Sequence, residues 1–299
     1  MATTSPATAR SDPGRVTVVI ATRDRRDRLL GTLDQLRALP EAPPIVVVDN
    51  GSSDGSAEAV RRRSPPGVAV VALAENRGAA ARTIGVEQAA TPYVAFTDDD
   101  SGWMPGALTR AARHLDAHPR LGLLAAAVLV GPPGLGRLDP VSQLMARSPL
   151  SCPRHLPGPP VLGFLACGAV VRRAAYLEVG GFNPVLFFMG EERLLAYDLA
   201  HAGWDLAYAS DVEAVHEPAR RVVDPARQAL GVRNDLLTDW MRRPWPVALR
   251  STGALATRGL RDRAARRGLA AALRRAPVAL RQRRRLPDGV ERQVRRLDP

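Results

Sequence analysis

Four short apolar runs, each followed by a stretch of helical periodicity, constrain the fold of this chain more than any other feature. The runs are VTVVI at 16–20, IVVVD at 45–49, VAVVAL at 68–73 and YVAFT at 93–97. Helices are expected at 24–38, up to residue 63, at 77–90 and at 105–118. Continuous apolar strands that alternate with helices are typical of a mostly parallel sheet that is buried on both faces. The pattern predicts an α/β fold, whose ligands bind at the carboxyl ends of the strands.

The rest of the chain is less regular. Further strands are expected at 121–130, at 163–171 and at 205–210, with a long Gly/Pro-rich connection at 131–160 and a helix at 191–204. The predicted organisation is a polar, disordered lead at 1–15, one α/β domain at 16–219 and an Arg-rich helical extension at 220–299.

The positive charge of the chain belongs to the C-terminal extension. Residues 220–299 hold 21 Arg against 7 acidic residues, whereas residues 1–219 hold 21 Arg against 23. With Trp240 and Trp245 on one side and Arg on the other, the extension predicts either a solvated basic surface or peripheral association with an anionic membrane. Nucleic acid is not an expected partner, because the chain has no recognised nucleic-acid motif and little aromatic interleaving.

The sequence also indicates a cellular compartment. Cys152 and Cys167 are the two cysteines, and neither has the spacing of a metal ligand or of a disulfide framework. The N-terminus lacks the apolar core of a secretory signal, and no apolar run is long enough to span a bilayer. We expect a cytoplasmic protein, peripheral at the inner face of the cell membrane if the extension binds lipid.

Three consecutive aspartates, Asp98, Asp99 and Asp100, follow the apolar run at 93–97, and Asp49 ends the run at 45–49. Parallel strands end at one edge of the sheet, so these carboxylates are expected to lie near each other. Such a cluster is tolerable when a divalent cation neutralises it, and Mg²⁺ or Mn²⁺ would use substrate phosphates as further ligands. The alternative is a solvated acidic turn that caps the next helix.

An ordered set of motifs resembles the family 2 glycosyltransferases of the GT-A fold. The motifs are VVIATRDR (18–25), VVVDNGSSDGS (46–56), ENRGAAARTIGV (75–86), YVAFTDDD (93–100), WMPGALTRAARHLDAHPRLGLLAA (103–126), GGFNPVLFFMGEERLLAYDLAHAGWDLAY (180–208) and EAVHEP (213–218). The resemblance implies a Rossmann-like, mostly parallel central sheet flanked by helices. It also implies inverting transfer of a sugar from a nucleotide-diphosphosugar, with a lean toward UDP or dTDP, to a hydroxyl acceptor such as a lipid-linked glycan, a polysaccharide or a secondary metabolite.

The resemblance assigns donor-binding residues. They are Ala21, Thr22, Arg23, Asp24, Asp49, Arg82, Asp98 and Asp99. Arg23 replaces the aromatic residue that the family usually has, so base stacking differs here. Asp49 would hydrogen-bond the base, and its alternative role is to form a turn before Asn50. Arg82 would face the nucleotide or the acidic triplet, and its alternative is a surface position on an amphipathic helix.

The metal and the catalytic base are implied in the same way. Asp98 and Asp100 match the D-x-D motif that binds Mn²⁺ or Mg²⁺, and Asp99 is its variable middle position, which we expect to tolerate substitution best. His216 would approach the metal or the diphosphate, unless it is a structural histidine.

An inverting transfer needs a base to take the proton of the acceptor hydroxyl. Glu191 and Glu192 stand where the family usually has Glu-Asp, and Glu192 is the first choice. Both could instead be acids favoured at a helix N-terminus.

Two other functions remain as hypotheses. A sugar-phosphate nucleotidyltransferase would need a Gly-rich basic loop after the first strand. The stretch ATRDRRDRLL at 21–30 contains no glycine, which weighs against this function. A non-catalytic polyanion- or membrane-binding protein on a degenerate transferase fold is disfavoured by the intact acidic triplet and glutamate pair.

Overall fold

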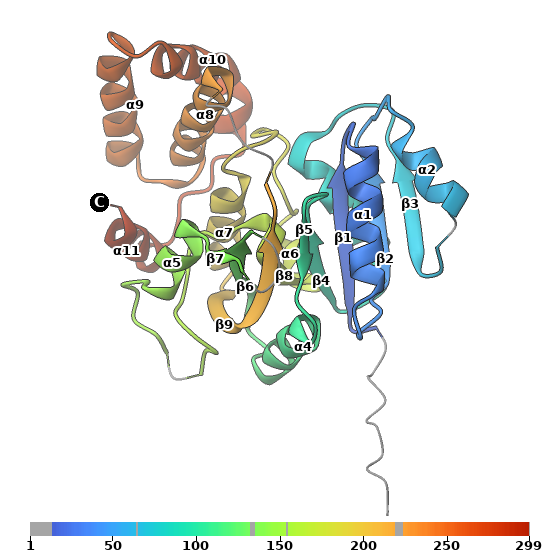
Figure 1. Ribbon diagram of the computed structural model, residues 1–299. Coiled ribbons are helices and arrows are strands. Elements are labelled where there is room, and N and C mark those ends of the chain that lie inside the picture. Colours follow the sequence, from blue (N-terminus) through green and yellow to red (C-terminus); the bar gives the residue numbers. More distant parts are fainter. Residues whose placement is uncertain (1–13, 64, 132–134, 154, 219–223, 299) are drawn as a thin grey trace, which may run out of the picture.

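The computed structural model describes residues 14–298, except 64, 132–134, 154 and 219–223. Most of the lead predicted at 1–15 therefore lies outside the described residues. The α/β prediction is confirmed: one nine-stranded sheet is flanked by helices, and a helical region follows at the C-terminal end (Figure 1).

The elements follow the predicted alternation over the first hundred residues. The strands are β1 Val16–Thr22, β2 Ile45–Asp49, β3 Val68–Ala72, β4 Tyr93–Thr97, β5 Ser101–Trp103, β6 Leu121–Val130, β7 Arg137–Leu138, β8 Ala169–Arg172 and β9 Asp205–His216. The α-helices are α1 Arg26–Arg37, α2 Ser56–Arg63, α3 Ala81–Gln88, α4 Ala107–Ala117, α5 Pro140–Ala146, α6 Arg173–Glu178, α7 Glu191–His201, α8 Pro225–Arg242, α9 Trp245–Gly259, α10 Arg263–Arg281 and α11 Asp288–Leu297.

The strand order brings the predicted site residues to one edge. The order is β3-β2-β1-β4-β8-β6-β9-β5, with β7 paired to β6, and β3, β2, β1 and β4 run parallel. Thr22 of β1 pairs with Asp49 of β2, and Ile20 of β1 pairs with Thr97 of β4. The residues that follow β1, β2 and β4 therefore meet at the carboxyl edge of the sheet.

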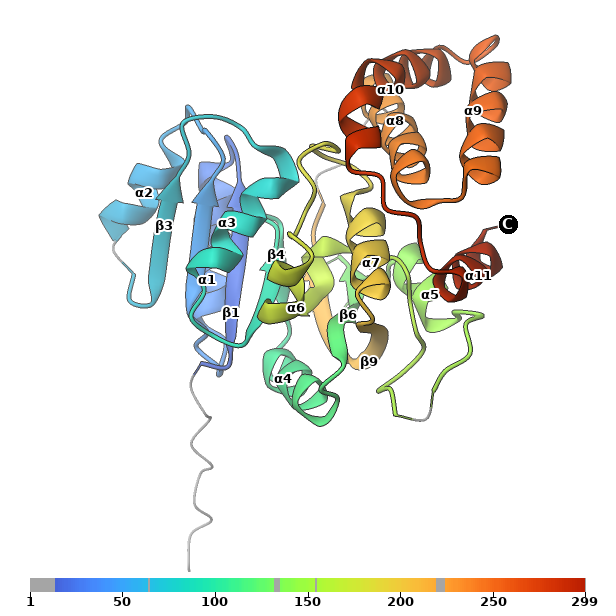
Figure 2. The same ribbon diagram turned by 180° about the vertical axis from the view of Figure 1, so that it is seen from behind.

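Helices cover both faces of the sheet, which explains why its strands are apolar throughout. Helices α1, α2 and α4 lie on one face, where Leu29, Leu33 and Leu115 join the core (Figure 1). Helices α3, α6 and α7 lie on the other face, seen from behind, where Tyr176 and Leu199 are buried (Figure 2).

Two predicted strands were wrong in extent. The expected strand at 163–171 is a strand only from Ala169, because 166–168 form a single 3₁₀ turn. The expected strand at 205–210 continues to His216, so this histidine ends the strand rather than following it. Strand β9 continues past an irregularity in its pairing with β6, and the polar residues Ser210 and Asp211 there face solvent.

The C-terminal extension is packed against the sheet domain rather than spread over its surface. Helices α8, α9 and α10 form a group beside α7, and the chain then returns so that α11 lies near α5 and α7 (Figures 1 and 2). Trp240 was expected on an exposed side, but it is 7% exposed and donates to Thr252 from a shared core. In the part of the chain that the structure describes, no helix is both long and apolar enough to cross a membrane.

Candidate active site

A pocket of about 550 Å³ opens at the carboxyl edge of the parallel strands. Of the predicted site residues, it is lined by Ala21, Thr22, Arg23, Arg82, Asp98, Asp99 and Asp100. It is also lined by residues that the sequence did not identify as site residues, among them Arg25, Asn50, Phe187, Phe188, Asp224 and Arg227. Asp224 and Arg227 stand at the start of the C-terminal extension, so α8 contributes to the pocket wall.

Asp99, the middle aspartate, is the one most firmly held by neutral and charged donors. Its carboxylate accepts from Thr22 Oγ1 at 2.8 Å and from Arg25 Nη1 at 2.9 Å, and its backbone oxygen accepts from Thr32 at 2.9 Å. Burial raises the pKa of Asp99 despite these donors, because removal from water penalises its charged form.

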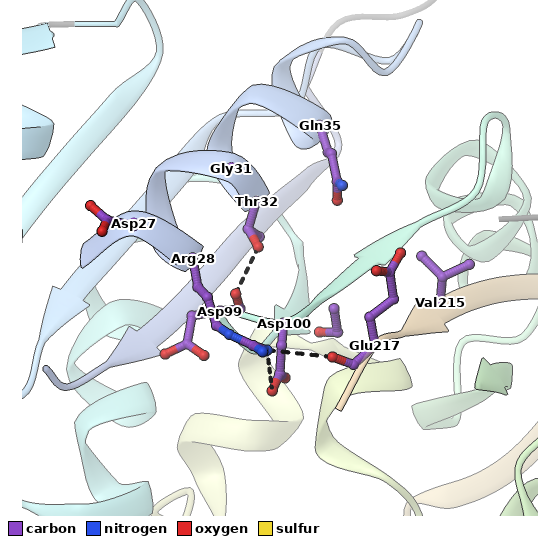
Figure 3. Close-up of a pocket in the computed structure, with 10 residues that line it drawn as sticks. Asp27, Arg28, Gly31, Thr32, Gln35, Asp99, Asp100, Val215 and Glu217 are labelled. Atoms are coloured by element: carbon purple, nitrogen blue, oxygen red, sulfur yellow. Dashed lines mark hydrogen bonds and ion pairs between the residues drawn. The ribbon is translucent and has the colours of Figure 1, made fainter. Parts of the chain in front are cut away.

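Asp100 lies among cationic side chains. Arg25 Nη1 donates to its Oδ2 at 3.0 Å, and Arg28 Nη1 lies 3.6 Å from the same oxygen. Figure 3 shows Arg28 pointing to Asp100 in a smaller pocket of about 220 Å³. His216 Nε2 lies 3.3 Å from Oδ1. Burial opposes the charge of Asp100, but the neighbouring His216 and Arg25 more than offset it and lower the pKa of this carboxyl.

Asp98 pairs with Arg82 across the pocket. Arg82 Nη2 donates to Asp98 Oδ1 at 2.5 Å, and the arginine side chain is 8% exposed. Burial acts to lower the pKa of Arg82, but the charges of Asp98 and Glu191 outweigh it, so the net shift is upward. Arg82 therefore links the acidic triplet to the glutamates at the start of α7.

Glu191 and Glu192 are the first two residues of α7. Glu191 is 3% exposed, and this burial raises the pKa of its carboxyl. Burial first, and the charge of Glu191 second, raise the pKa of Glu192 to about 8. Two adjacent carboxyls of this kind share a proton near neutral pH, and a carboxyl whose pKa lies near the working pH can accept a proton from a substrate once it is deprotonated.

Asp49 is engaged by its own loop. Its carboxylate accepts from the backbone N–H groups of Ser52 at 3.0 Å and Ala57 at 3.2 Å, and the residue is 4% exposed. This is the turn-forming role, and the lining of the pocket includes the next residue, Asn50, instead. Contact between Asp49 and a nucleotide base stays a prediction.

The loop after β1 is tied to the loop after β2. Asp24 adopts a left-handed backbone with φ of 52°, and its Oδ1 accepts from the backbone N–H of Ser53 at 2.7 Å. Its own backbone N–H donates to Ser52 Oγ at 3.0 Å. Asp24 thus shapes the pocket rim, while Arg23 beside it is half exposed and free to reach a ligand.

The side chains fit a divalent cation in part. Within the described ranges, no three His, Cys, Asp or Glu side chains converge as a metal site on their own. Asp100 and His216 do meet, and among the described residues His216 Nε2 is a buried nitrogen that makes no well-aligned hydrogen bond. One carboxylate and one imidazole suit Mn²⁺ or Mg²⁺ when substrate oxygens and water complete the set.

Arg25 and Arg28 are site residues that the sequence prediction left out. They stand one helical turn apart at the start of α1 and face the acidic triplet. The sequence could have indicated them, because both lie where the chain passes from β1 into α1, and β1 and β4 were predicted to end at the same edge of the sheet. The contribution of Arg227 had no such signal, because it depends on how the extension packs.

Comparisons with known proteins agree with this geometry. N-acetylglucosaminyl-diphospho-decaprenol L-rhamnosyltransferase of Mycobacterium tuberculosis (strain CDC 1551 / Oshkosh) is 27% identical over 270 residues, which cover 77% of this chain and 86% of that protein. Succinoglycan biosynthesis protein ExoU of Rhizobium meliloti (strain 1021) is 35% identical over 100 residues, but the match spans only 32% of this chain and 29% of that protein.

A solved structure has a similar fold. The mannosyltransferase PcManGT from Pyrobaculum calidifontis, in complex with GDP-Man and Mn²⁺, superposes with a TM-score of 0.60 at 22% identity, over 90% of this chain and 72% of that chain. The likeness confirms the expected GT-A fold. The sequence model of the family described as "Glycosyl transferase family 2" matches residues 17–180, more than half of the chain. The chain therefore belongs to glycosyl transferase family 2.

Proposed function

We propose that this chain is a metal-dependent inverting glycosyltransferase that moves a sugar from a nucleotide-diphosphosugar to a hydroxyl of a lipid-linked glycan. One observation carries the proposal: Arg82 and Asp98 are bonded in the wall of one pocket, and Arg82 also lies close enough to Glu191 and Glu192 for their charges to act on it. Donor-binding and proton-accepting groups are thereby a short distance apart, as a direct displacement requires. Membership of family 2 supports sugar transfer from a nucleotide sugar.

The chain's own cations would receive the donor diphosphate. Arg23, Arg25 and Arg227 line the pocket, and guanidinium groups bind phosphate oxygens with two parallel hydrogen bonds. Arg25 is 42% exposed, so it can exchange Asp100 for a phosphate oxygen at little cost. UDP or dTDP remains the expected nucleotide.

Asp100 and His216 would hold the Mn²⁺ or Mg²⁺ ion, with Asp98 nearby on the same loop. When bound, the cation neutralises charge that develops on the leaving diphosphate. Two of the related solved structures are described with Mn²⁺ bound, and this supports a cation requirement in the fold.

Glu192 would accept the proton of the acceptor hydroxyl as that oxygen attacks the anomeric carbon. Its raised pKa makes it a base suited to neutral or mildly alkaline pH. Attack from the side opposite the leaving diphosphate inverts the anomeric configuration. The carboxylate of Glu191 would be stabilised by the nearby charge of Arg82, and Glu191 remains the alternative base.

The acceptor class rests on the relative from Mycobacterium tuberculosis, whose name describes an acceptor on a diphospho-decaprenol carrier. A lipid carrier would place this chain, a cytoplasmic protein in this proposal, at the inner face of the membrane. The extension offers exposed apolar residues among its arginines, namely Trp245, Leu249, Leu260, Leu273 and Val278. Such a surface favours anionic lipid.

The donor and metal can be tested together by thermal shift. UDP-N-acetylglucosamine, UDP-glucose, dTDP-L-rhamnose and GDP-mannose would each be added with and without MnCl₂, because a ligand that binds only the folded state raises the melting temperature. We expect one donor to stabilise the protein only with Mn²⁺, and Asp100→Ala to abolish this gain. No stabilisation by any donor, or no transfer of the selected sugar to a polyprenyl-diphosphate-linked acceptor, would contradict the proposal.

Flotation tests the membrane contact. We expect binding to vesicles that contain phosphatidylglycerol and none to pure phosphatidylcholine vesicles. Equal binding to both kinds of vesicle would contradict the proposal that the arginines attract the protein to anionic lipid.

A further inference from the structure

The loop that leads into α7 has an unusual hydrogen-bonding pattern. Each of five successive carbonyl oxygens, at residues 185–189, accepts a hydrogen bond from a residue outside the loop. Four of the five are held by side chains of the C-terminal extension, and the fifth, Phe187 O, accepts from the backbone N–H of Ala79 at 2.6 Å. The extension thus grips the backbone immediately before the two glutamates.

Asn234 of α8 is the centre of this contact. Its Nδ2 lies 3.0 Å from Leu186 O, 2.7 Å from Phe188 O and 2.5 Å from Met189 O, so its two N–H groups are shared among three carbonyls, and the residue is fully buried. Arg233 supports it, since Arg233 Nε donates to Asn234 Oδ1 at 2.8 Å. The amide of Asn234 is therefore oriented with its donors toward the loop.

Two further contacts extend the grip. Arg233 Nη2 also donates to Leu186 O at 2.5 Å, and Arg275 Nη1 of α10 donates to Val185 O at 2.8 Å. A buried arginine whose partner is a carbonyl rather than an acid gains no ion pair. Its hydrogen bonds to the loop are what offset its burial.

The loop needs such support because its backbone is strained. Phe187 and Met189 have positive φ values of 67° and 75°, a conformation that side chains other than glycine seldom adopt. Phe187 also approaches Gly78 so closely that a Cβ at this glycine would lie 2.1 Å from Phe187 O. Without external donors the loop would relax toward ordinary backbone angles.

We propose that Asn234, together with Arg233, is a positioning residue that fixes the 185–190 loop and thereby the place of Glu191 and Glu192 at the start of α7. Helix α7 begins at Glu191, directly after the loop, so any shift of the loop moves the first turn of the helix. The Arg-rich extension then has a part in catalysis through its buried face. This inference rests on the proposed function, which makes the glutamates the base.

The test compares three variants of the full chain. Asn234→Ala removes the amide that contacts three loop carbonyls. Arg275→Ala removes one hydrogen bond from a more exposed position on α10, so this variant should fold even if Asn234→Ala does not. Gln228→Ala is the matched control, because it removes an amide from an exposed position of the same helix. Hydrogen–deuterium exchange of peptides that span 182–192 needs no substrate and reads the loop directly.

We expect exchange in 182–192 to be about tenfold faster in Asn234→Ala, smaller but measurable acceleration in Arg275→Ala, and wild-type exchange in Gln228→Ala. With the donor selected by thermal shift, kcat should fall by about 10- to 100-fold in Asn234→Ala while donor KM changes far less, as a misplaced base requires. If the variant only contained less folded protein, kcat divided by the concentration of folded protein would equal the wild-type value.

The outcomes separate the two proposals. Wild-type exchange in both Asn234→Ala and Arg275→Ala would overturn the positioning role, whatever the kinetics. Faster exchange with unchanged kcat would overturn the link between loop and base. If Glu192→Gln and Glu191→Gln both keep full transfer, the proposed base is wrong, and this result is independent of the exchange measurement.

Discussion

Arginine–carboxylate pairs occur in two regions of this molecule and are built in opposite ways. At the acidic triplet, Arg25 reaches Asp100 while 42% of its side chain stays exposed. Between α7 and the extension, Arg242 pairs with Asp198 through two hydrogen bonds, and the two side chains are 3% and 5% exposed. An exposed pair contributes little and can be exchanged, whereas breaking a buried pair leaves a charge without compensation.

The difference teaches that the arginine content of the chain has two separate uses. At the acidic triplet, the half-exposed guanidinium of Arg25 holds its carboxylates in a way that a ligand can replace, whereas Arg82 is buried against Asp98. In the extension, the same groups join helices permanently, as Arg243 does with Glu291 at 2% and 5% exposure. The five predictions that follow would each break or sharpen this comparison.

The largest effect is expected on the pocket side, for Glu192→Gln. Removal of a general base lowers turnover by about 10²- to 10⁴-fold, and the amide is nearly the same size, so the fold should persist. Transfer kinetics and circular dichroism measure the two properties. Activity within tenfold of wild type would exclude Glu192 as the base.

The same residue predicts two pH dependences. Because the pKa of Glu192 is raised to about 8, kcat/KM should rise with pH and level off above this value, where the base is deprotonated. Stability should move the opposite way: the folded state holds the proton more tightly, so the free energy of unfolding falls as pH rises from the unfolded pKa toward 8. Glu192→Gln should remove that part of the slope in denaturant titrations at several pH values.

The next effect is expected in the extension, for Asp198→Ala. The change leaves Arg242 buried without its acid and should lower the free energy of unfolding by about 3–5 kcal/mol. Urea denaturation measures the loss, and activity per folded molecule should remain closer to wild type than in Glu192→Gln. A loss below about 1 kcal/mol, the upper range for an exposed pair, would show that the Asp198–Arg242 pair does not hold the extension against α7.

A smaller effect should distinguish neighbours within the triplet. The surroundings of Asp100 favour its charge and those of Asp99 oppose it, so Asp100→Asn should cost about 1.5–3 kcal/mol more stability than Asp99→Asn, the range for hydrogen bonds to charged groups. Asp100→Asn should also lose more transfer activity. Equal losses in both variants would contradict the assignment of Asp99 as the more tolerant position.

The smallest change in stability is expected for Arg25→Ala. Arg25 itself is 42% exposed, although its partners Asp99 and Asp100 are largely buried, so its loss should cost less than that of Asp198, and added salt should reduce the difference further. Donor binding should weaken nonetheless, which thermal shift with the selected donor would detect. A stability loss as large as that of Asp198→Ala would show that the pocket pairs are structural after all.

Much of the fold was predictable because its signals are local. The runs that became β1 to β4 are rich in β-branched residues and alternate with amphipathic stretches, so their order and direction follow from pattern alone. Strand β5 was missed because three residues, SGW, carry no periodicity. The strand predicted at 163–171 was too long because residues 166–168 are Ala, Cys and Gly, whose small side chains suit a tight turn equally well.

The site was predictable in its parts rather than in its pairings. The sequence indicated Asp98, Asp100 and the two glutamates. The structure places both aspartates in the pocket wall, where Arg82 bonds to Asp98 and lies close enough to the glutamates to be affected by their charges. Which arginine meets which carboxylate depends on packing between segments that are 16 to 75 residues apart in the chain. For the same reason nothing local in the sequence distinguished the buried Asn234 from a solvent-facing asparagine on an amphipathic helix.

The contacts of the 185–189 loop also bear on the order in which the protein can mature during synthesis. The strands and Asp98–Asp100 emerge from the ribosome early, but the donors to the loop come from residues 233, 234 and 275, and acids that pair with Arg243 come only at 291 and 298. A nascent chain can therefore complete its sheet well before it can complete its catalytic end. Ribosome-bound intermediates would bind nucleotide before they could transfer sugar.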